Sequence, residues 1–370
     1  MSDPATVPPT GLGQAPPGTS LTARAPVPTT MGAWQTAYDG RLTPVELPVP
    51  VPRPGEVLLH VEACGVCRTD LHVIEGDLPP HRSPVVPGHE IVGEVVAVGD
   101  GTSTTDGVQV GRQVGVPWLR STCGVCRSCR AGAENLCPSS RYTGWDEDGG
   151  YAEYAVAPAA YTYPIPDTLH PVQAAPLLCA GIIGYRALKR AALPPAGRLG
   201  IYGFGASAHL TAQIALEQGA EVHVVTRDEA ARELALELGA ASAVGADGVP
   251  PVPLDSAIVF APAGEVVSAA LAALDRGGTV SVAGIHVSDL PALDYEHQLF
   301  YEKTLTSVTS NTRADGAELM ALAGRLGLRA TATTYPFSRA GDALVDLAAD
   351  RVRGVAVLTD SAFTGVAPAG

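Results

Sequence analysis

The 370-residue sequence has no long apolar run and few basic residues. Without a run of about 18 apolar residues, no transmembrane helix is expected. Residues 1–30 contain no apolar segment of the kind that forms the core of a secretory signal, so we expect an intracellular, cytoplasmic protein. The 24 Lys and Arg against 38 Asp and Glu give a formal net charge of −14. This balance argues against a nucleic acid or an anionic membrane surface as the main partner.

Charged residues are also scarce, at 17% of the chain, whereas hydrophobic residues make up 46%. This composition is typical of a globular protein with a sizeable core, and the length suggests two or three domains. Residues 1–30 are rich in Pro, Thr, Ala and Gly without periodicity, which predicts a disordered arm. In a reducing compartment, the seven cysteines are expected to bind metal or to act in catalysis rather than to form disulfides.

The two halves of the chain differ in pattern. Residues 33–161 contain short Val-rich runs bounded by Gly, Pro and Asp, which predicts a β-rich unit. From residue 171 onward, helical and strand-like stretches alternate, which predicts an α/β fold with a doubly wound parallel sheet. The predicted strands are 198–202, 221–225, 241–244, 257–260, 279–283 and 354–358. The predicted helices are 173–192, 209–218, 228–238, 265–274, 316–326 and 339–350.

Four cysteines lie close together in the pattern C-x2-C-x2-C-x7-C. They are Cys123, Cys126, Cys129 and Cys137. Four thiolates at this spacing can surround one Zn²⁺ tetrahedrally, at about 2.3 Å from each sulfur, and leave no position for a substrate. We therefore predict a structural zinc site here. Two short disulfides or unrelated buried thiols are the alternatives.

Three further potential zinc ligands are scattered along the chain: Cys67, His89 and Cys179. Two thiolates and one imidazole would leave the fourth position of a tetrahedral zinc open to water or substrate, which is the layout of a catalytic zinc. There the metal acts as a Lewis acid on an alcohol or carbonyl oxygen. Taken singly, each residue is equally explained as a packed side chain, and Cys64 with Cys67 could form a redox CxxC pair.

A Gly-rich turn follows the predicted strand 198–202 and opens a helix. Gly203 permits the tight turn, Gly205 lets the backbone approach a pyrophosphate, and Ala208 keeps the helix close to the strand. His209 begins that helix and is expected to be solvated on its surface, with a contact to phosphate as the alternative. The next strand ends at Thr226 and Arg227, where an NAD site normally places an acidic residue. This ending favours NADP over NAD, although Asp228 offers a carboxylate to NAD if the turn is shifted by one or two positions.

Together these features resemble the zinc-dependent alcohol dehydrogenases of the medium-chain dehydrogenase/reductase superfamily. The motifs that carry the resemblance are Cys64–His72, Gly88–Glu90, Cys123–Cys137 and the Gly-rich turn. It covers about residues 33–360. The resemblance implies that Cys67, His89 and Cys179 bind a catalytic zinc, that Cys64 is a bystander, and that each chain binds two zinc ions.

The same resemblance implies roles for five neighbouring residues. Thr69 hydrogen-bonds the reacting alcohol, and His72 is the outer end of a proton relay that runs through the cofactor ribose. Asp70 orients the His89 ring, Glu90 is the acidic residue behind the zinc, and Arg68 reaches the cofactor pyrophosphate. From spacing alone, an exposed loop histidine and a turn aspartate are the simpler readings of His72 and Asp70.

The predicted architecture is a GroES-like, β-barrel-type catalytic domain at 31–178 and 313–370, and a Rossmann domain at 179–312. The predicted reaction is reversible hydride transfer between a primary, secondary or aromatic alcohol and NAD(P), in a homodimer or homotetramer. Small alcohols, aldehydes or ketones are the expected partners. A polyol or formaldehyde dehydrogenase is the nearest alternative, and a non-catalytic protein on the same scaffold is a more distant one.

Four apolar residues are expected to shape the substrate pocket: Trp118, Trp145, Leu119 and, by resemblance, Ile74. Relatives often carry a bulkier aromatic residue at the position of Ile74, so we expect room for medium-length or aromatic alcohols. Ordinary core packing is the alternative for both tryptophans.

Overall fold

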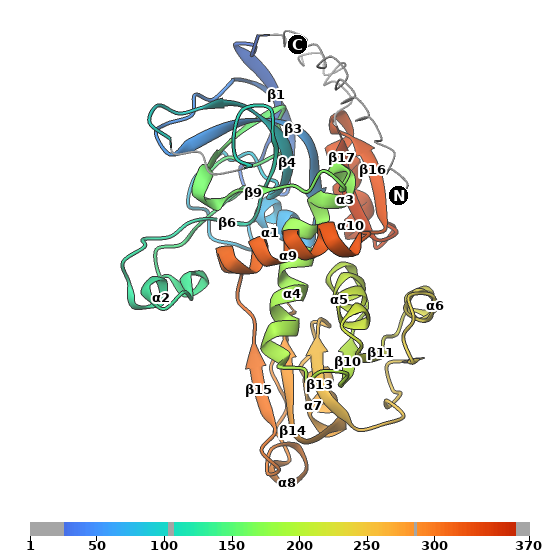
Figure 1. Cartoon of the computed structure of the whole chain (residues 1–370). Helices are drawn as coiled ribbons and strands as arrows, with labels where there is room; N and C mark the ends of the chain where they lie inside the picture. The colour runs from blue at the N-terminus through green and yellow to red at the C-terminus, as the bar shows by residue number, and fades with distance from the viewer. Residues whose placement is uncertain (1–25, 103–106, 285–286, 360–370) are drawn as a thin grey trace, which may run out of the picture.

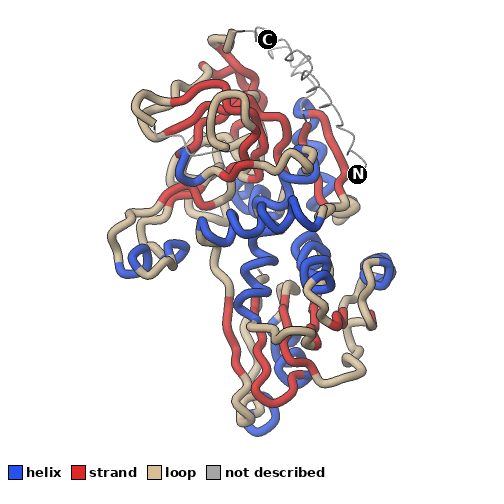
Figure 2. Tube along the Cα trace, in the orientation of Figure 1, coloured by secondary structure: helices blue, strands red, loops and turns tan. Residues whose placement is uncertain are grey.

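The computed structural model describes residues 26–102, 107–284 and 287–359. Within them the chain forms two units, each built around its own sheet, which lie at opposite ends of the molecule (Figure 1). Strands dominate the upper unit, whereas the lower one alternates strands and helices (Figure 2). The predicted disordered arm falls mostly on residues 1–25, which lie outside the described residues.

The lower unit is a six-stranded parallel sheet with the strand order β12-β11-β10-β13-β14-β15. Its strands are β10 (Arg198–Tyr202), β11 (Glu221–Val225), β12 (Ser242–Val244), β13 (Leu254–Val259), β14 (Leu274–Val282) and β15 (Thr304–Ser307). Its helices are α4 (Ala180–Ala191), α5 (Ala206–Glu217), α6 (Glu229–Glu237), α7 (Gly264–Ala273) and α8 (Tyr295–Gln298). This is the predicted Rossmann-type α/β sheet, and the fold class is confirmed.

Side chains of the central strands alternate between two hydrophobic clusters, one on each face of this sheet. Leu199 and Ile201 of β10 belong to the cluster formed with α4 and α5, whereas Tyr202 belongs to the cluster formed with α7. A strand that is apolar on both faces is expected in a parallel sheet covered by helices on both sides. The strand order also reverses direction at β10, and the crevice beyond the carboxyl end of β10 is where such sheets bind ligands.

The upper unit is built on a seven-stranded sheet with the order β16-β17-β3-β4-β5-β9, in which β8 also pairs with β3. Its strands are β3 (Glu56–Val66), β4 (Glu90–Val98), β5 (Gln113–Val116), β8 (Tyr154–Pro158), β9 (Tyr163–Pro164), β16 (Ala332–Pro336) and β17 (Val355–Thr359). Two short antiparallel pairs accompany it, β1 (Thr30–Gln35) with β2 (Thr43–Pro48) and β6 (Leu119–Ser121) with β7 (Arg141–Tyr142). β17 pairs antiparallel with β3, so the end of the described chain returns to the upper unit.

Nine helices, most of them short, complete this unit and its junction with the Rossmann sheet within the described residues. The α-helices are α1 (Arg68–Glu75), α2 (Arg127–Arg130), α3 (Pro171–Ala174), α9 (Arg313–Leu326) and α10 (Ala340–Ala348). The 3-10 helices are η1 (Glu134–Leu136), η2 (Ala159–Tyr161), η3 (Ala175–Leu178) and η4 (Phe337–Arg339). In the part of the chain that the structure describes, no helix combines the length and the apolar character needed to cross a bilayer.

The structure corrects the predicted continuous helix over 173–192. The segment divides into α3, η3 and α4, and the break falls at Cys179, whose φ of −126° and ψ of −74° are not helical. Pro176 lies inside the broken region and has no backbone N–H to donate to a helix. The strands β10 and β11 have the predicted limits, whereas β15 and β16 were not predicted at all.

Candidate functional site

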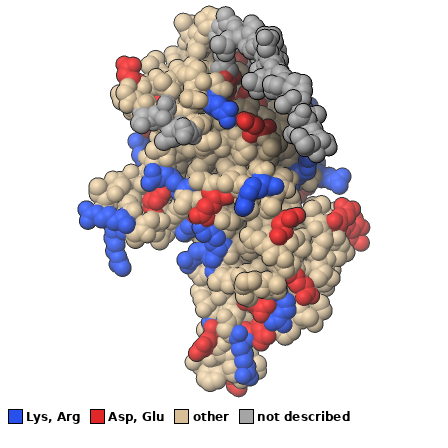
Figure 3. Space-filling model, in the orientation of Figure 1, with Lys and Arg blue, Asp and Glu red and all other residues tan. Residues whose placement is uncertain are grey.

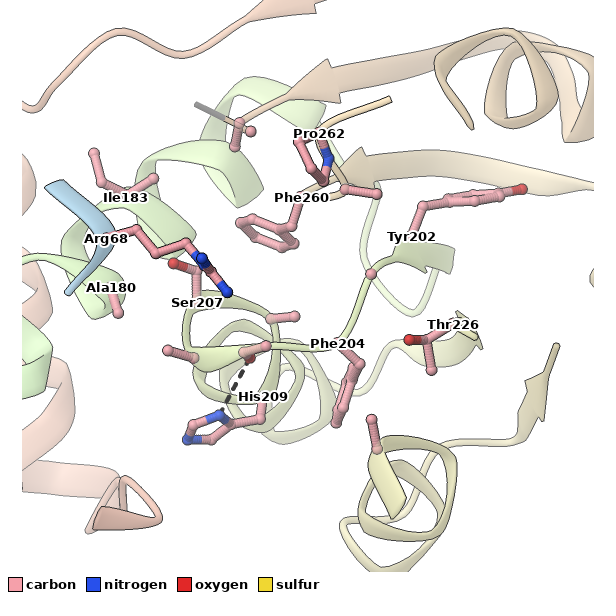
Figure 4. A pocket seen from close by; sticks show the side chains of 18 of the residues that line it. Arg68, Ala180, Ile183, Tyr202, Phe204, Ser207, His209, Thr226, Phe260 and Pro262 are labelled. Atoms are coloured by element: carbon pink, nitrogen blue, oxygen red, sulfur yellow. Dashed lines mark hydrogen bonds between the residues drawn. The ribbon is translucent and has the colours of Figure 1, made fainter. Parts of the chain in front are cut away.

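A single large cleft runs between the two units, with a volume of about 2030 Å³. Its walls combine the start of α1, the Gly-rich turn before α5, the end of β11 and the segment that joins β15 to α9. Figure 4 shows the part of the cleft around the Gly-rich turn, where Arg68 from the upper unit points toward Ser207 on α5. Apart from the four-cysteine loop, the motifs that the sequence analysis singled out therefore face one space.

Cys67, His89, Glu90 and Cys179 converge at this cleft. They offer one ligand atom each, and these atoms all lie within 4.8 Å of one another. Cys67 precedes α1, His89 and Glu90 lie at the start of β4, and Cys179 lies at the break between η3 and α4. The Cys67 Sγ and His89 Nε2 atoms are 3.4 Å apart. Cys67, His89 and Cys179 are the three predicted ligands. Glu90, which was predicted to lie behind the metal, also places a carboxylate oxygen within 4.8 Å of their ligand atoms.

Asp70 fixes the orientation of the His89 ring. Nδ1 of His89 donates to Oδ1 of Asp70 at 3.1 Å, and both side chains are 1% exposed. Oδ2 of Asp70 accepts from the Cys67 backbone N–H at 2.9 Å. One carboxylate thus holds two candidate ligands, which directs the His89 Nε2 lone pair toward the cluster.

Glu90 is the least satisfied group in the cluster. It is fully buried, and neither of its carboxylate oxygens has a hydrogen-bond partner among the described residues. Burial raises the pKa of the Glu90 carboxyl well above its usual range, and the charges of Cys67 and Asp70 raise it further. A buried carboxylate beside two thiols and an imidazole is a donor set that suits Zn²⁺, because the cation would supply the missing partner.

The four cysteines of the second motif also come together. Cys123, Cys126, Cys129 and Cys137 lie within 4.8 Å of one another, with a Cys126–Cys129 sulfur separation of 3.5 Å, and none forms a disulfide. Backbone N–H groups point at the sulfurs, for example Cys126 N–H to Cys123 Sγ at 3.3 Å. Such bonds from Val125 and Cys126 lower the pKa of the Cys123 thiol to about 6. The backbone around Cys123 therefore favours its thiolate, the form that binds zinc.

The Gly-rich turn is shaped for a dinucleotide. Gly203 has a φ of 84°, and a Cβ there would lie 3.0 Å from the Ala261 backbone nitrogen. A Cβ on Gly205 would meet nothing within 4 Å, so the backbone is open to the cleft just before the N-terminus of α5. Ala208 is fully buried behind the turn. An open backbone cradle at a helix N-terminus fits a pyrophosphate.

His209 is not the solvated residue that the sequence suggested. It is 3% exposed, and its Nδ1 donates to the Gly205 carbonyl at 3.3 Å, as the dashed line in Figure 4 shows. Burial lowers the pKa of the His209 imidazole. The neutral ring therefore supports the Gly-rich turn through this hydrogen bond.

The end of β11 carries one carboxylate, that of Asp228, which lines the cleft. Thr226 lines the cleft and Arg227 beside it is exposed. Asp228 caps α6, with Oδ1 accepting from Ala230 N–H at 3.0 Å. Arg232, which the sequence analysis missed, donates from Nη1 to the Thr226 and Arg227 carbonyls at 3.0 and 2.9 Å. Its only sequence signal is an arginine about one turn into the helix that follows the strand.

Thr69, His72 and Arg68 all line the cleft, at the start of α1. His72 Nδ1 lies 2.7 Å from Asp77 Oδ2, which fixes the tilt of the ring. Arg68 Nη2 pairs with Asp350 Oδ1 at 2.5 Å, and both side chains are largely exposed. Because an exposed ion pair contributes little free energy, Arg68 can leave Asp350 and bind a phosphate at little cost in stability.

The aromatic residues near the cluster form a stack. Trp118 lines the cleft and meets the His89 ring edge-on, with centroids 4.9 Å apart. Trp145 lies behind it, parallel within 7°, and is not among the lining residues. Ile74 and Leu119 are buried at 5% and 1% exposure and do not line the cleft either, so the expectation that they shape the pocket is wrong. Leu78 and Tyr142 take their place.

Comparison with known proteins gives one consistent family. Residues 53–167 match the model of the alcohol dehydrogenase GroES-like domain, and residues 208–325 match that of zinc-binding dehydrogenases. A "Probable alcohol dehydrogenase AdhA" of Mycobacterium tuberculosis is 56% identical, over 89% of this chain and 97% of that protein. An alcohol dehydrogenase of Geobacillus stearothermophilus is 38% identical, over 82% and 91%. The solved acetophenone reductase of Geotrichum candidum, in complex with NAD, has a TM-score of 0.80 at 29% identity, over 91% and 99%.

The four-cysteine loop leads to a first prediction. Cys126→Ser should remove one zinc ion per chain and lower Tm by about 5 °C or more, because four thiolates around a metal contribute folding free energy. Metal analysis and thermal unfolding measure both effects. Ser128→Ala, in the same loop, is the matched control and should keep both values. An unchanged Tm in Cys126→Ser would contradict a structural role.

Proposed function

This chain belongs to the zinc-dependent alcohol dehydrogenase family of the medium-chain dehydrogenase/reductase superfamily, and from that premise we propose which of its residues take part in alcohol oxidation. It is an oxidoreductase with two zinc sites, a structural one of four cysteines and a catalytic one of Cys, His and Glu donors. We assign the catalytic metal to Cys67, His89 and Cys179. The observation that carries this assignment is the buried, unpartnered Glu90 beside those three donors.

The proposed chemistry divides between the bound groups and the side chains. When bound, zinc supplies Lewis acidity and the nicotinamide exchanges the hydride with the substrate carbon. Thr69 accepts the hydrogen bond of the substrate hydroxyl, and as it receives that proton its own hydroxyl proton leaves toward His72. His72, held by Asp77, returns a proton to solvent, a task that suits an imidazole because it can both accept and donate one. Asp70 keeps His89 in the tautomer whose Nε2 can bind metal.

For the substrate we propose a primary, secondary or aromatic alcohol and its aldehyde or ketone. Trp118, Tyr142 and Leu78 give the cleft an apolar wall beside the metal donors, and the Trp118 ring is held rigid by its stack with Tyr142 and Trp145. A flat, rigid indole offers a face on which another ring packs well.

For the architecture we propose a catalytic domain of residues 31–178 and 313–370 and a dinucleotide domain of 179–312, in a homodimer or homotetramer. The pairing of β17 with β3 supports placing the end of the described chain in the catalytic domain. Among the described residues, β15 is an edge strand that pairs with β14 alone. The aromatic side chains of Tyr295 and Phe300 near it are 66% and 56% exposed, which supports burial of this edge by another chain.

The proposed ligand assignment is tested by Cys179→Ser. This variant should lose turnover, because one of the three metal ligands is gone, and should still bind the dinucleotide, because the Gly-rich turn is untouched. Steady-state kinetics and fluorescence titration with NADPH measure the two properties. Cys64→Ala is the control, since Cys64 is fully buried but outside the donor cluster. Full activity in Cys179→Ser would refute the assignment.

The proposed relay is tested by two substitutions of graded effect. Thr69→Ala should slow alcohol oxidation by about 10²–10⁴-fold, since no other hydroxyl takes the proton, and Thr69→Ser should restore most of the rate. His72→Gln should slow it by only about tenfold, because water can partly replace a histidine near the surface. Pre-steady-state hydride transfer is the measurement, and a normal rate in Thr69→Ala would remove this residue from the mechanism.

We further propose that NADP(H) is preferred over NAD(H). Thr226 does not repel a 2′-phosphate, Asp228 engages one carboxylate oxygen as a helix cap, and Arg227 offers a planar fork of donors. Glu233, Glu237 and Asp247 also line this end of the cleft, so their charge keeps the preference modest.

Arg227→Ala should therefore reduce kcat/KM for NADP by roughly ten- to a hundredfold and leave NAD nearly unchanged. Thr226→Asp should reverse the order of the two cofactors. Steady-state kinetics with both dinucleotides decides the matter, and a clear wild-type preference for NAD would contradict the proposal.

A further inference from the structure

The four-cysteine loop touches the segment by which the chain leaves the Rossmann sheet. Glu134 and Asn135 of η1 lie between Cys129 and Cys137, and they are 7% and 3% exposed. Oε1 of Glu134 accepts from the Arg313 backbone N–H at 3.1 Å and from its Nε at 2.9 Å. Nδ2 of Asn135 donates to the Thr309 carbonyl at 2.7 Å. Two neighbouring loop residues therefore hold the connection from β15 to α9, which Figure 1 shows between the two units.

That connection is a wall of the cleft. Val308, Thr309, Ser310 and Asn311 line the same space as the Gly-rich turn and the Cys67–His89–Cys179 cluster. Val308 N–H donates to the Val282 carbonyl at 2.9 Å, which anchors the segment to the sheet. A dinucleotide that extends from the Gly-rich turn toward the metal donors must pass along this wall.

Ser310, in the middle of the segment, has a strained backbone. Its φ is 50°, in the left-handed region that a residue with a side chain rarely adopts. Its buried Oγ has no hydrogen-bond partner among the described residues. Strain of this kind persists only where the surroundings fix the conformation, and it is concentrated at ligand-binding sites.

The anchors lie on both sides of Ser310. Thr309, immediately before it, is held by Asn135, and Arg313, three residues after it, is held by Glu134. The far side is fixed in addition by the cap of α9, where Thr312 Oγ1 donates to Asp315 at 2.8 Å, and Asp315 pairs with Arg186 of α4 at 2.5 Å. The four-cysteine loop thus holds the segment on both sides of the strained residue, and Tyr163 of β9 adds a hydrogen bond from Asn311 Nδ2 at 3.5 Å.

The Glu134–Arg313 contact is ionised as well as hydrogen-bonded. Burial alone would raise the pKa of the Glu134 carboxyl, but the hydrogen bonds and charge of Arg313 bring that pKa below its usual value. The Arg313 guanidinium in turn lies over the Tyr161 ring, 4.9 Å from its centroid. A charge-assisted bond to a backbone N–H is stronger and more directional than a neutral one, so it can hold a backbone position.

We propose that Glu134 and Asn135 are positioning residues for the dinucleotide, because they hold Val308–Arg313 in the one conformation that presents Ser310 to the cleft. The zinc that organises the four-cysteine loop then acts on cofactor affinity as well as on stability. This inference rests on the proposed dinucleotide site in the cleft. It assigns no catalytic step to either residue, since both act through the segment that they hold.

The test uses the zinc-loaded full chain and the variants Glu134→Gln, Asn135→Ala and, as the partner, Arg313→Met. Each should weaken NADPH binding by about five- to thirtyfold in a fluorescence titration, since the freed segment can relax from the strained state. KM for the dinucleotide should rise in proportion while kcat changes less than about threefold. Hydrogen exchange at residues 308–312 should accelerate.

Arg130→Ala is the matched control. Basic side chains gather on the lobe around α2 (Figure 3), and Arg130 belongs to that exposed set, so its loss changes the loop charge without touching the segment. It should bind NADPH as the wild type does. A double-mutant cycle of Glu134→Gln with Arg313→Met should be strongly non-additive.

Two failures can be told apart. If the wild type binds NADPH or NADH but the three variants keep their zinc and bind within twofold of it, the positioning role is refuted and the proposed function stands. If the wild type binds neither dinucleotide, the proposed cleft and this inference fall together. Should Glu134→Gln fail to retain zinc, Asn135→Ala and Arg313→Met decide the outcome.

Discussion

The convergence of two thiols, an imidazole and a carboxylate in a buried space is the constraint on which the rest of this structure depends. Cys67, His89 with Glu90, and Cys179 come from three distant parts of the chain, and their donor atoms lie within 4.8 Å of one another. Bringing them together requires the C-terminal end of β3 and the N-terminal end of β4 to lie beside the break in the helical segment at Cys179, just before α4. Because an unpaired buried carboxylate is costly, Glu90 stabilises this arrangement only when a cation completes it.

The break at Cys179 also connects the metal donors to the Rossmann sheet. Cys179 ends the upper unit, and α4, which begins one residue later, packs against the Rossmann sheet. The metal donors and the Gly-rich turn are therefore fixed in one frame, with Thr69 and His72 between them at the start of α1. The return segment after β15 closes the cleft from the other side, and the four-cysteine loop holds it. A loop far from the reacting atoms can thus affect the binding of the cofactor.

Much of this site could be predicted from the sequence, because cysteine spacing and the strand–turn–helix pattern are local signals. The four-cysteine loop, the Gly-rich turn and the strands β10 and β11 needed no tertiary information. Cys67, His89 and Cys179 are scattered along the chain, so they were assigned only through the family resemblance. The break at Cys179 was missed, since helix propensity over 173–192 is high and tertiary contacts overrode it. Sequence patterns also missed three residues that act through backbone groups. Glu134 and Asn135 contact a segment far away in the sequence, and Arg232 contacts the carbonyl groups just after β11. Ile74 and Leu119 were misplaced because sequence alone did not show which way their side chains point.

Anomalous diffraction at the zinc edge, from crystals grown with NADPH, would test the central claim most directly. The expected result is two metal peaks per chain, one inside Cys123–Cys137 and one bonded to Cys67, His89 and Cys179 within about 2.0–2.3 Å. The dinucleotide should cross Gly205, with its nicotinamide between the second metal and Ser310. A second peak on other residues, or a dinucleotide bound outside the cleft, would contradict the assignment of this cleft as the active site.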